Sequence, residues 1–113
     1  MKKLYNSTKN TVLAHRLYEA RSFFQRLVGL LSRSPLQPGE ALLLEPCCCI
    51  HTFFMDYPLD VLFYDKEKRV VAIFAEMPPW RCTPLVRRAR GAIEFPPGTL
   101  KTAGTGVGDR LKW

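Results

Sequence analysis

Short apolar stretches, separated by polar or Pro- and Gly-containing segments, run through most of this chain. Runs of this length between turn-forming residues are typical of β-strands. They predict strands near residues 4–5, 12–14, 41–44, 59–64, 70–75, 92–95 and 110–113. The first two pieces form either two strands or a frayed start and one strand. The polar linker 65–69 predicts a β-hairpin between its flanking runs.

A helical pattern occupies residues 20–32, where apolar side chains recur at spacings of three and four. Ser22 and Gln25 form a capping-box pattern at its start, and Pro35 follows its end. The sequence therefore predicts one helix over about 20–32.

The length of 113 residues suits one domain, 1–113, without a linker. We expect an α+β fold in which mostly short antiparallel strands form a curled or barrel-like sheet. The helix at about 20–32 would cover one face of that sheet or plug its open end.

Charge and cysteine content narrow the class of protein. The formal net charge is +7, which raises the odds of a polyanionic partner, although many basic proteins have none. Four cysteines, three of them adjacent, do not form the spaced framework of a secreted domain, so we expect a reducing compartment. No apolar run is long enough for a signal peptide or a membrane span. We therefore expect a cytoplasmic protein with no membrane partner.

The segment 47–55 concentrates the most unusual chemistry. If it is extended, alternate side chains share one face, including Cys47, Cys49, His51 and Met55. Cys47, Cys49 and His51 are candidate ligands for zinc or copper. A thiol nucleophile is a second alternative. The third is a buried strand in which cysteine acts as a small apolar residue. No cofactor is predicted, with zinc or copper kept as the alternative.

Two acidic residues interrupt apolar strands. Asp60 and Glu94 both lie in such runs, where a carboxylate is unfavourable unless it is paired or hydrogen-bonded. Arg26, or an arginine of the 81–90 segment, would satisfy Asp60. Polar groups inside apolar strands are also typical of binding pockets. The candidate ligand-binding residues are His51, Met55, Asp60, Glu94 and Arg26.

The segment 77–91 reads as a long exposed loop that carries Trp80 and four arginines. Arginine beside an exposed aromatic ring suits single-stranded nucleic acid or an acidic protein surface. A solvated loop without a partner is the alternative. The candidate basic surface consists of Arg81, Arg87, Arg88 and Arg90.

Five segments resemble motifs of one family. They are 26–33 (RLVGLLSR), 39–44 (GEALLL), 51–55 with 58–65 (HTFFM and PLDVLFYD), 93–98 (IEFPPG) and 108–111 (GDRL). The family is the domain of unknown function numbered 192, also catalogued as uncharacterised protein family 0127. The resemblance covers about residues 20–112 and implies a small α+β domain rich in antiparallel strands. Many relatives carry Trp-Met-Lys-Asn-Thr at the central signature, so the His-Thr-Phe-Phe-Met version looks like a distinct branch.

The resemblance implies no established activity, so the function rests on the residues themselves. The main hypothesis is a non-catalytic module that binds a small ligand or a protein in a pocket lined by the candidate residues. The alternatives are a Cys/His metal or thiol site, and an arginine-loop binder of nucleic acid or an acidic partner. A terminal strand permits edge pairing, so we expect a monomer or a weak dimer.

Overall fold

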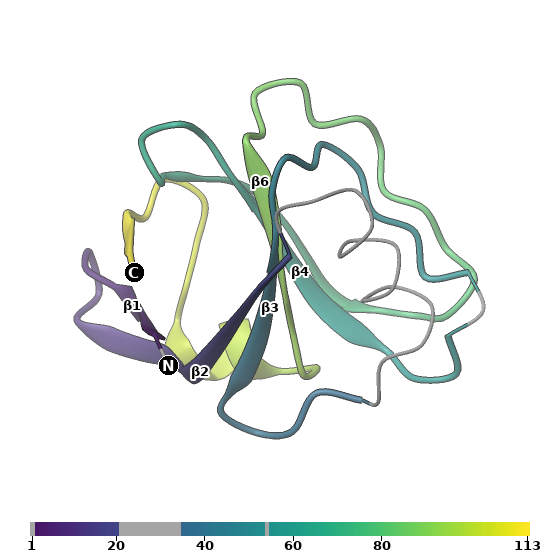
Figure 1. Ribbon diagram of the computed structural model, residues 1–113, viewed down its shortest axis with the longest axis horizontal. Coiled ribbons are helices and arrows are strands. Elements are labelled where there is room, and N and C mark those ends of the chain that lie inside the picture. The colour runs from purple at the N-terminus through teal and green to yellow at the C-terminus, as the bar shows by residue number, and fades with distance from the viewer. Residues whose placement is uncertain (1, 21–34, 54) are drawn as a thin grey trace.

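Seven strands form one curled sheet in the computed structural model, which describes residues 2–20, 35–53 and 55–113 (Figure 1). The strands are β1 (Lys2–Asn6), β2 (Thr11–Ala20), β3 (Glu40–Leu44), β4 (Leu59–Tyr64), β5 (Val70–Met77), β6 (Gly91–Phe95) and β7 (Leu111–Lys112). One short helix, α2 (Thr99–Ala103), completes the described elements. The strand-rich, curled architecture confirms the predicted class.

The strand order is β5-β4-β6-β3-β2-β1-β7, and only the β2–β3 pair is parallel. The predicted hairpin is confirmed as β4–β5, in which Leu62 pairs with Ile73. Asp65 shapes its turn by accepting hydrogen bonds from the backbone N–H groups of Glu67 and Arg69. Strand β6 lies between β3 and β4, so it is central and buried throughout.

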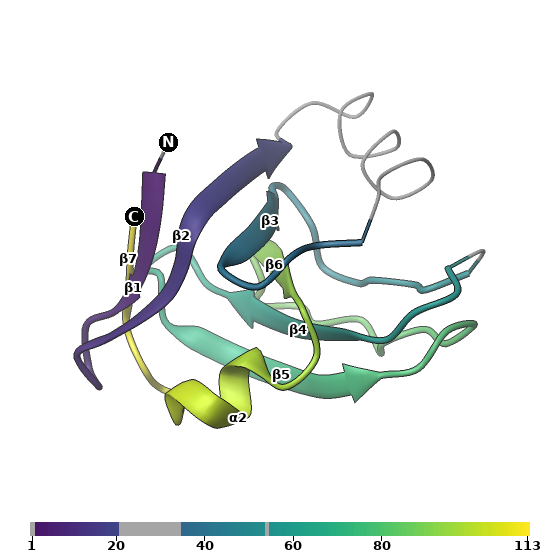
Figure 2. The same ribbon diagram turned by 90° about the horizontal axis from the view of Figure 1, so that it is seen from below.

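The two edges of the sheet meet at one end, which makes the curl a half-barrel. The Gly108 N–H donates to the Val70 carbonyl and the Leu111 N–H to the Lys68 carbonyl, both at 2.8 Å. Away from this seam β5 and β2 separate, and α2 lies between them (Figure 2). Leu100 of α2 joins the apolar interior there.

Each face of the sheet carries its own apolar cluster, because side chains alternate along a strand. The inner cluster includes Leu43, Leu62, Ile93 and Phe95. The outer cluster is built on the opposite face. It contains Leu42, Leu44, Val61, Phe63 and Ala92 from the strands, with Ile50, Met55 and Val86 from the loops.

The predicted helix over about 20–32 lies outside the described residues, except for Ala20, which is the last residue of β2. Helix α2 was not predicted. Gly98 and Gly104 flank it with positive φ angles, and those glycines indicated only turns in the sequence. No helix in the described ranges is long and apolar enough to cross a membrane.

Candidate binding site on the paired loops

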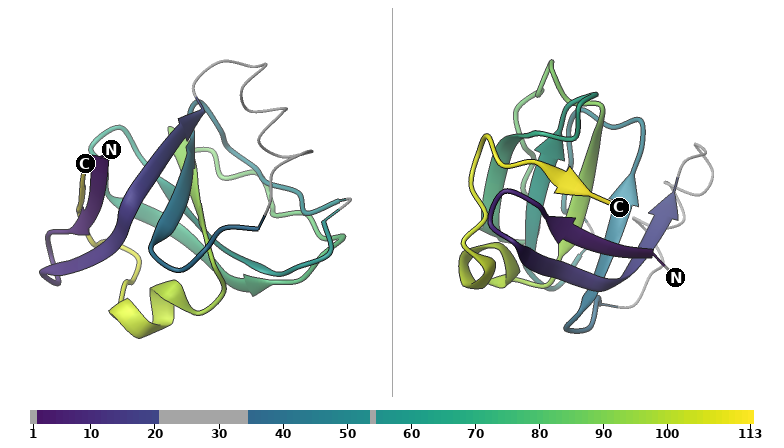
Figure 3. Two further views of the ribbon diagram at one scale, coloured as in Figure 1. Left: turned by 60° about the horizontal axis from the view of Figure 1, so that its bottom comes forward. Right: turned by 90° about the vertical axis from the view of Figure 1, so that its left-hand side faces the viewer.

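Two loops leave the sheet on the same side and run next to each other (Figure 3). We call residues 45–53, 55–58 and 78–90 the paired loops. Backbone hydrogen bonds of 2.8 Å join them, from Thr83 to Ile50, from Thr52 to Arg81 and from Val86 to Cys48. The 78–90 segment is therefore held along its length by its neighbour.

Thr52 organises the turn at the tip of the paired loops. It is fully buried, and its hydroxyl donates to the Pro78 carbonyl at 2.7 Å and accepts from the Arg81 N–H at 2.9 Å. Its carbonyl accepts from the Trp80 N–H at 2.9 Å. These bonds hold Trp80 at a φ of 61°, a left-handed conformation that bulky residues rarely adopt.

This turn places three rings in a row. The His51 and Phe53 rings stack with centroids 4.9 Å apart, and the Phe53 and Trp80 rings with centroids 6.0 Å apart. The interplanar angles are 26° and 28°, so the rings are close to parallel. Phe53 is 39% exposed and Trp80 55% exposed. We call His51, Phe53 and Trp80 the aromatic row.

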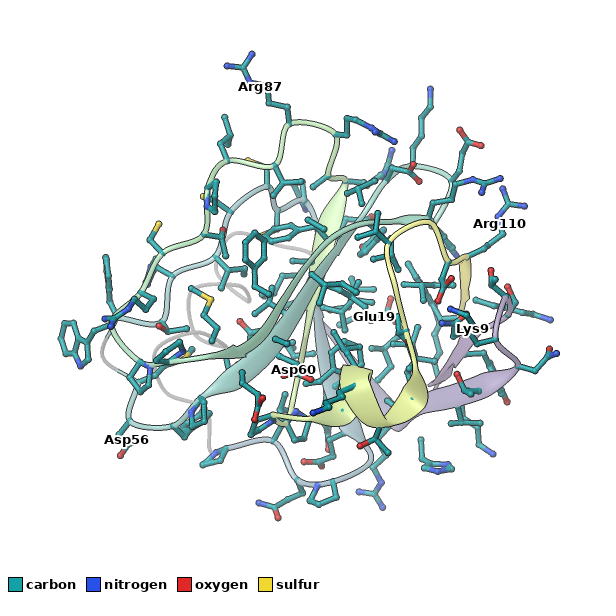
Figure 4. The ribbon with its side chains drawn as sticks, turned by 180° about the vertical axis from the view of Figure 1, so that it is seen from behind. Lys9, Glu19, Asp56, Asp60, Arg87 and Arg110 are labelled. Atoms are coloured by element: carbon teal, nitrogen blue, oxygen red, sulfur yellow. The ribbon has the colours of Figure 1, made fainter. Side chains whose placement is uncertain are left out.

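Arginines follow the aromatic row along the 78–90 segment. All four predicted members of the basic surface are exposed. Arg90 lies 3.8 Å from Glu45 and Arg88 lies 4.0 Å from Asp65. Arg81 and Arg87 form no ion pair with any residue that the structure describes, and Arg87 extends away from the fold in Figure 4.

The extended conformation considered for 47–55 does not form. That segment is irregular and contains one isolated bridge, between His51 and Cys82. Its amides bond to the 78–90 segment, and the Thr52 and Thr83 side chains replace part of the backbone ladder. The predicted single face that carries Cys47, Cys49, His51 and Met55 therefore does not form.

All four cysteines are free, and their environments differ. Cys47 packs against the outer cluster, and burial raises the pKa of its thiol to about 11. Cys49 is exposed, yet partial burial and the neighbouring Cys48 and Cys82 thiols raise its pKa as well. A thiol nucleophile requires the opposite shift. These thiols are therefore poorly suited to covalent catalysis.

The predicted metal ligands Cys47, Cys49 and His51 do not converge. Within the described ranges, no group of three or more His, Cys, Asp or Glu side chains is arranged to hold a metal ion. The buried Nδ1 of His51 has no hydrogen-bond partner among the described residues. His51 contributes to the site through its ring, stacked on Phe53.

The predicted pocket shared by His51, Met55, Asp60 and Glu94 is also wrong, because the register puts the two acids on opposite faces. Asp60 pairs with Phe95 of the inner cluster. Glu94 pairs with Val61 and Leu42 of the outer cluster, where Met55 also packs. Figure 4 shows Asp60 near α2, while Asp56 extends from the paired loops.

Asp60 has a structural set of partners. Its carboxylate accepts from the Glu76 N–H at 2.8 Å and from the Leu100 N–H at 3.0 Å, so it ties β5 and α2 to β4. Within the described residues its hydrogen-bond partners are backbone amides, and no arginine of the 81–90 segment is among them. Arg26 itself lies outside the described residues.

Comparison with known proteins places the chain. Residues 5–113 match the model of the family described as "Uncharacterized ACR", the domain of unknown function 192. The chain belongs to this family. A UPF0127 protein of Pyrococcus abyssi is 33% identical over 116 residues, covering 97% of this chain and 96% of the relative. One of Pyrococcus horikoshii is 34% identical over 113 residues, with 97% of each chain covered.

The fold of this family member also resembles a solved structure. A crystal structure of a protein of unknown function from Novosphingobium aromaticivorans superposes with a TM-score of 0.81 at 22% identity. The superposition covers 98% of this chain and 82% of the other. At that identity the likeness establishes the half-barrel fold.

The sequence identified Trp80, the arginines and His51 separately, and missed Phe53 and Thr52 as parts of the site. Phe53 lies on one loop and Trp80 on the other, so their stacking depends on loop pairing. The one available signal was Thr52, a polar residue inside an apolar signature.

Proposed function

We propose that the protein is a non-catalytic binding module whose paired loops bind single-stranded nucleic acid. The observation that supports this proposal is the aromatic row, three nearly parallel rings that end in the half-exposed Trp80. Unpaired bases stack on such rings, and each base contributes about 1–3 kcal/mol.

The charge next to the row supports an anionic strand. The paired loops carry four arginines and two carboxylates, Glu45 and Asp56. Arg81 follows Trp80 directly, so a guanidinium accompanies the ring on which a base would stack. Phosphates that pass along the 78–90 segment would meet Arg87 next, where an exposed cation is available.

The hydrogen bonds of Thr52 support a prepared site. Trp80 and Arg81 are fixed by three hydrogen bonds to that one residue, so little conformational entropy is lost when a partner binds. The raised pKa values of Cys47 and Cys49 favour a binding role over thiol catalysis.

Tryptophan fluorescence tests this proposal. The chain has two tryptophans, so Trp113→Phe leaves Trp80 as the only indole reporter. We expect a short single-stranded oligonucleotide to quench Trp80 saturably at low salt, with an affinity that falls steeply as salt rises. In the same background, Phe53→Ala should weaken binding by about tenfold, the loss of roughly one stacking contact. Arg87→Gln should weaken it about threefold and reduce the salt dependence.

Matched control substitutions can be made on the half-barrel, away from the paired loops. Val12 is an exposed apolar residue and Arg110 an exposed arginine, both outside the paired loops, so Val12→Ala and Arg110→Gln should leave quenching unchanged. Absence of quenching at low salt would overturn the proposal. So would equal quenching by duplex DNA, or quenching by an acidic peptide alone, which would identify a protein partner.

A further inference from the structure

A hollow of about 430 Å³ opens beside the barrel seam, and no residue of the aromatic row lines it. Segments far apart in sequence line it: the start of β1, the end of β4, the β4–β5 turn, the residue before β6 and the residue after β7. Its size lies at the lower end of the range for small-molecule sites.

Tyr64 forms the floor of this hollow and is itself buried. Its hydroxyl donates to Glu45 Oε2 at 2.6 Å, and its ring meets the edge of Trp113 with centroids 4.8 Å apart. Gly91 makes room for Tyr64, because a Cβ at that position would collide with the phenol and approach the Leu44 carbonyl to 2.8 Å. The floor is thus fixed by packing.

Four cations surround the hollow, namely Lys2, Lys66, Lys68 and Arg90, against two carboxylates, Glu45 and Asp65. Lys68 Nζ lies 4.1 Å from the Trp113 ring centroid and 3.4 Å from the Trp113 carbonyl. Arg90 Nε is 3.8 Å from Glu45 Oε1, which is too long for a hydrogen bond and leaves that donor available to a ligand. Cations outnumber carboxylates along this lining, so the net charge of the hollow favours an anion.

A second hollow of about 430 Å³ continues from the first around the β4–β5 turn. The two share Asp65, Lys66 and Arg90, and the second adds Arg88 and Glu67. Cations outnumber carboxylates in both. A ligand of two or three anionic groups can therefore bridge them with Lys66 and Arg90 at its centre.

We propose that this hollow is a binding site for a compact polyanion, of the diphosphate or tricarboxylate kind. Lys66 and Arg90 bind the anionic groups, and Lys2 and Lys68 complete the rim. Lys68 leaves the Trp113 ring as it turns toward the ligand. The aromatic row, Arg81 and Arg87 do not contribute to this site, although Glu45, Arg88 and Arg90 belong to the paired loops.

The test uses the other tryptophan. In a Trp80→Phe chain, Trp113 is the only indole and stands in the wall of the hollow. We expect inorganic pyrophosphate, titrated at constant ionic strength, to change Trp113 emission saturably. Equilibrium dialysis of labelled pyrophosphate against the unmodified chain should give one bound ion per chain. Citrate, added as a competitor, distinguishes the two kinds of ligand. A site that prefers tricarboxylates releases pyrophosphate at a lower citrate concentration than a site that prefers diphosphates.

Charge-matched variants locate the site. Lys66→Gln and Arg90→Gln should each weaken pyrophosphate binding by about tenfold, the effect of one charge-assisted hydrogen bond. Lys101→Gln removes the same charge from the exposed face of α2 and should leave binding unchanged. Dialysis that detects no bound pyrophosphate at about 1 mM probe, or an equal loss in Lys101→Gln, would overturn the proposal.

Discussion

Polar residues have different roles in the half-barrel and in the paired loops. In the half-barrel, the buried Asp60 and Asp109 carboxylates accept hydrogen bonds from backbone or side-chain donors of other elements, Glu76, Leu100 and Asn6. In the paired loops, the buried polar residue Thr52 fixes a turn, and the aromatic and cationic groups around it remain exposed. Asp60 and Asp109 stabilise the fold, whereas the exposed aromatic and cationic groups of the paired loops are available to a partner.

This comparison changes how the acidic residues are interpreted. A carboxylate inside an apolar strand suggested a ligand site, yet each oxygen of the Asp60 carboxylate accepts a hydrogen bond from an amide of its own chain. The exposed groups are less unusual in sequence, but backbone hydrogen bonds between the two loops control their geometry. Substitutions can separate the two roles, since one class should alter stability and the other partner binding.

The largest expected effect is on the barrel. Asp60→Ala leaves the amides of Glu76 and Leu100 without their acceptor, so we expect the free energy of unfolding to fall by about 3 kcal/mol. Urea denaturation measures this loss. The exposed Asp56 provides the control, and Asp56→Ala should change the free energy by less than about 0.5 kcal/mol. Equal effects in the two variants would contradict the structural role of Asp60.

A smaller loss of stability, with a larger effect on the site, is expected in the paired loops. Thr52→Val keeps the shape but removes the bonds to Pro78 and Arg81, so the free energy of unfolding should fall by about 2 kcal/mol. Amide hydrogen exchange at Trp80 and Arg81 should accelerate through local opening. Exchange of the β6 amides should change only as much as the global free energy of unfolding does. The exposed Thr102 on α2 serves as the control, and Thr102→Val should leave exchange at Trp80 unchanged.

The smallest effect is a pH dependence at the seam. Burial alone would raise the pKa of Asp109, but hydrogen bonds from Asn6 and Gly106 and the charge of Lys9 outweigh it and lower the pKa below its usual value. A carboxyl whose folded pKa lies below its unfolded pKa stabilises the fold above the unfolded value, about 3.9. That contribution is lost as the pH falls through the folded pKa.

Urea unfolding of the wild type and of Asp109→Asn, measured from about pH 7 to about pH 3, checks this expectation. The wild type should be more stable than Asp109→Asn above about pH 4, and the difference should shrink as the pH falls through the folded pKa of Asp109. A difference that grows on acidification would contradict the assigned sign.

The strands could be predicted because local pattern determines them. The runs 59–64, 70–75 and 92–95 contain apolar residues between clear turn signals, and β4, β5 and β6 occupy nearly the same positions. The first two runs belong to the longer β1 and β2, whose mixed polarity reflects one exposed face. Helix α2 has only five residues, too few for a helical period.

The site was less predictable, because tertiary pairing creates it. Alternation along 47–55 suggested a strand, but bonds to the 78–90 segment keep that segment irregular. The opposite orientation of Asp60 and Glu94 follows from the relative register of β4 and β6, which no single segment encodes. The hollow at the seam forms where residues from both ends of the sequence, such as Lys2 and Trp113, come together. Proximity in sequence therefore gives no signal for it.

The seam itself has a consequence for how the chain folds. Tyr5 pairs with Lys112, and Asn6 binds Asp109 at 2.9 Å across 103 residues of sequence. Contacts between such distant residues form late, because the loop they close loses much entropy before it gains any stabilisation. During synthesis, β1 and β2 are made long before β7, the strand that pairs with the other side of β1. We therefore expect the barrel seam to close slowly, with the β1 edge of the sheet open until β7 emerges.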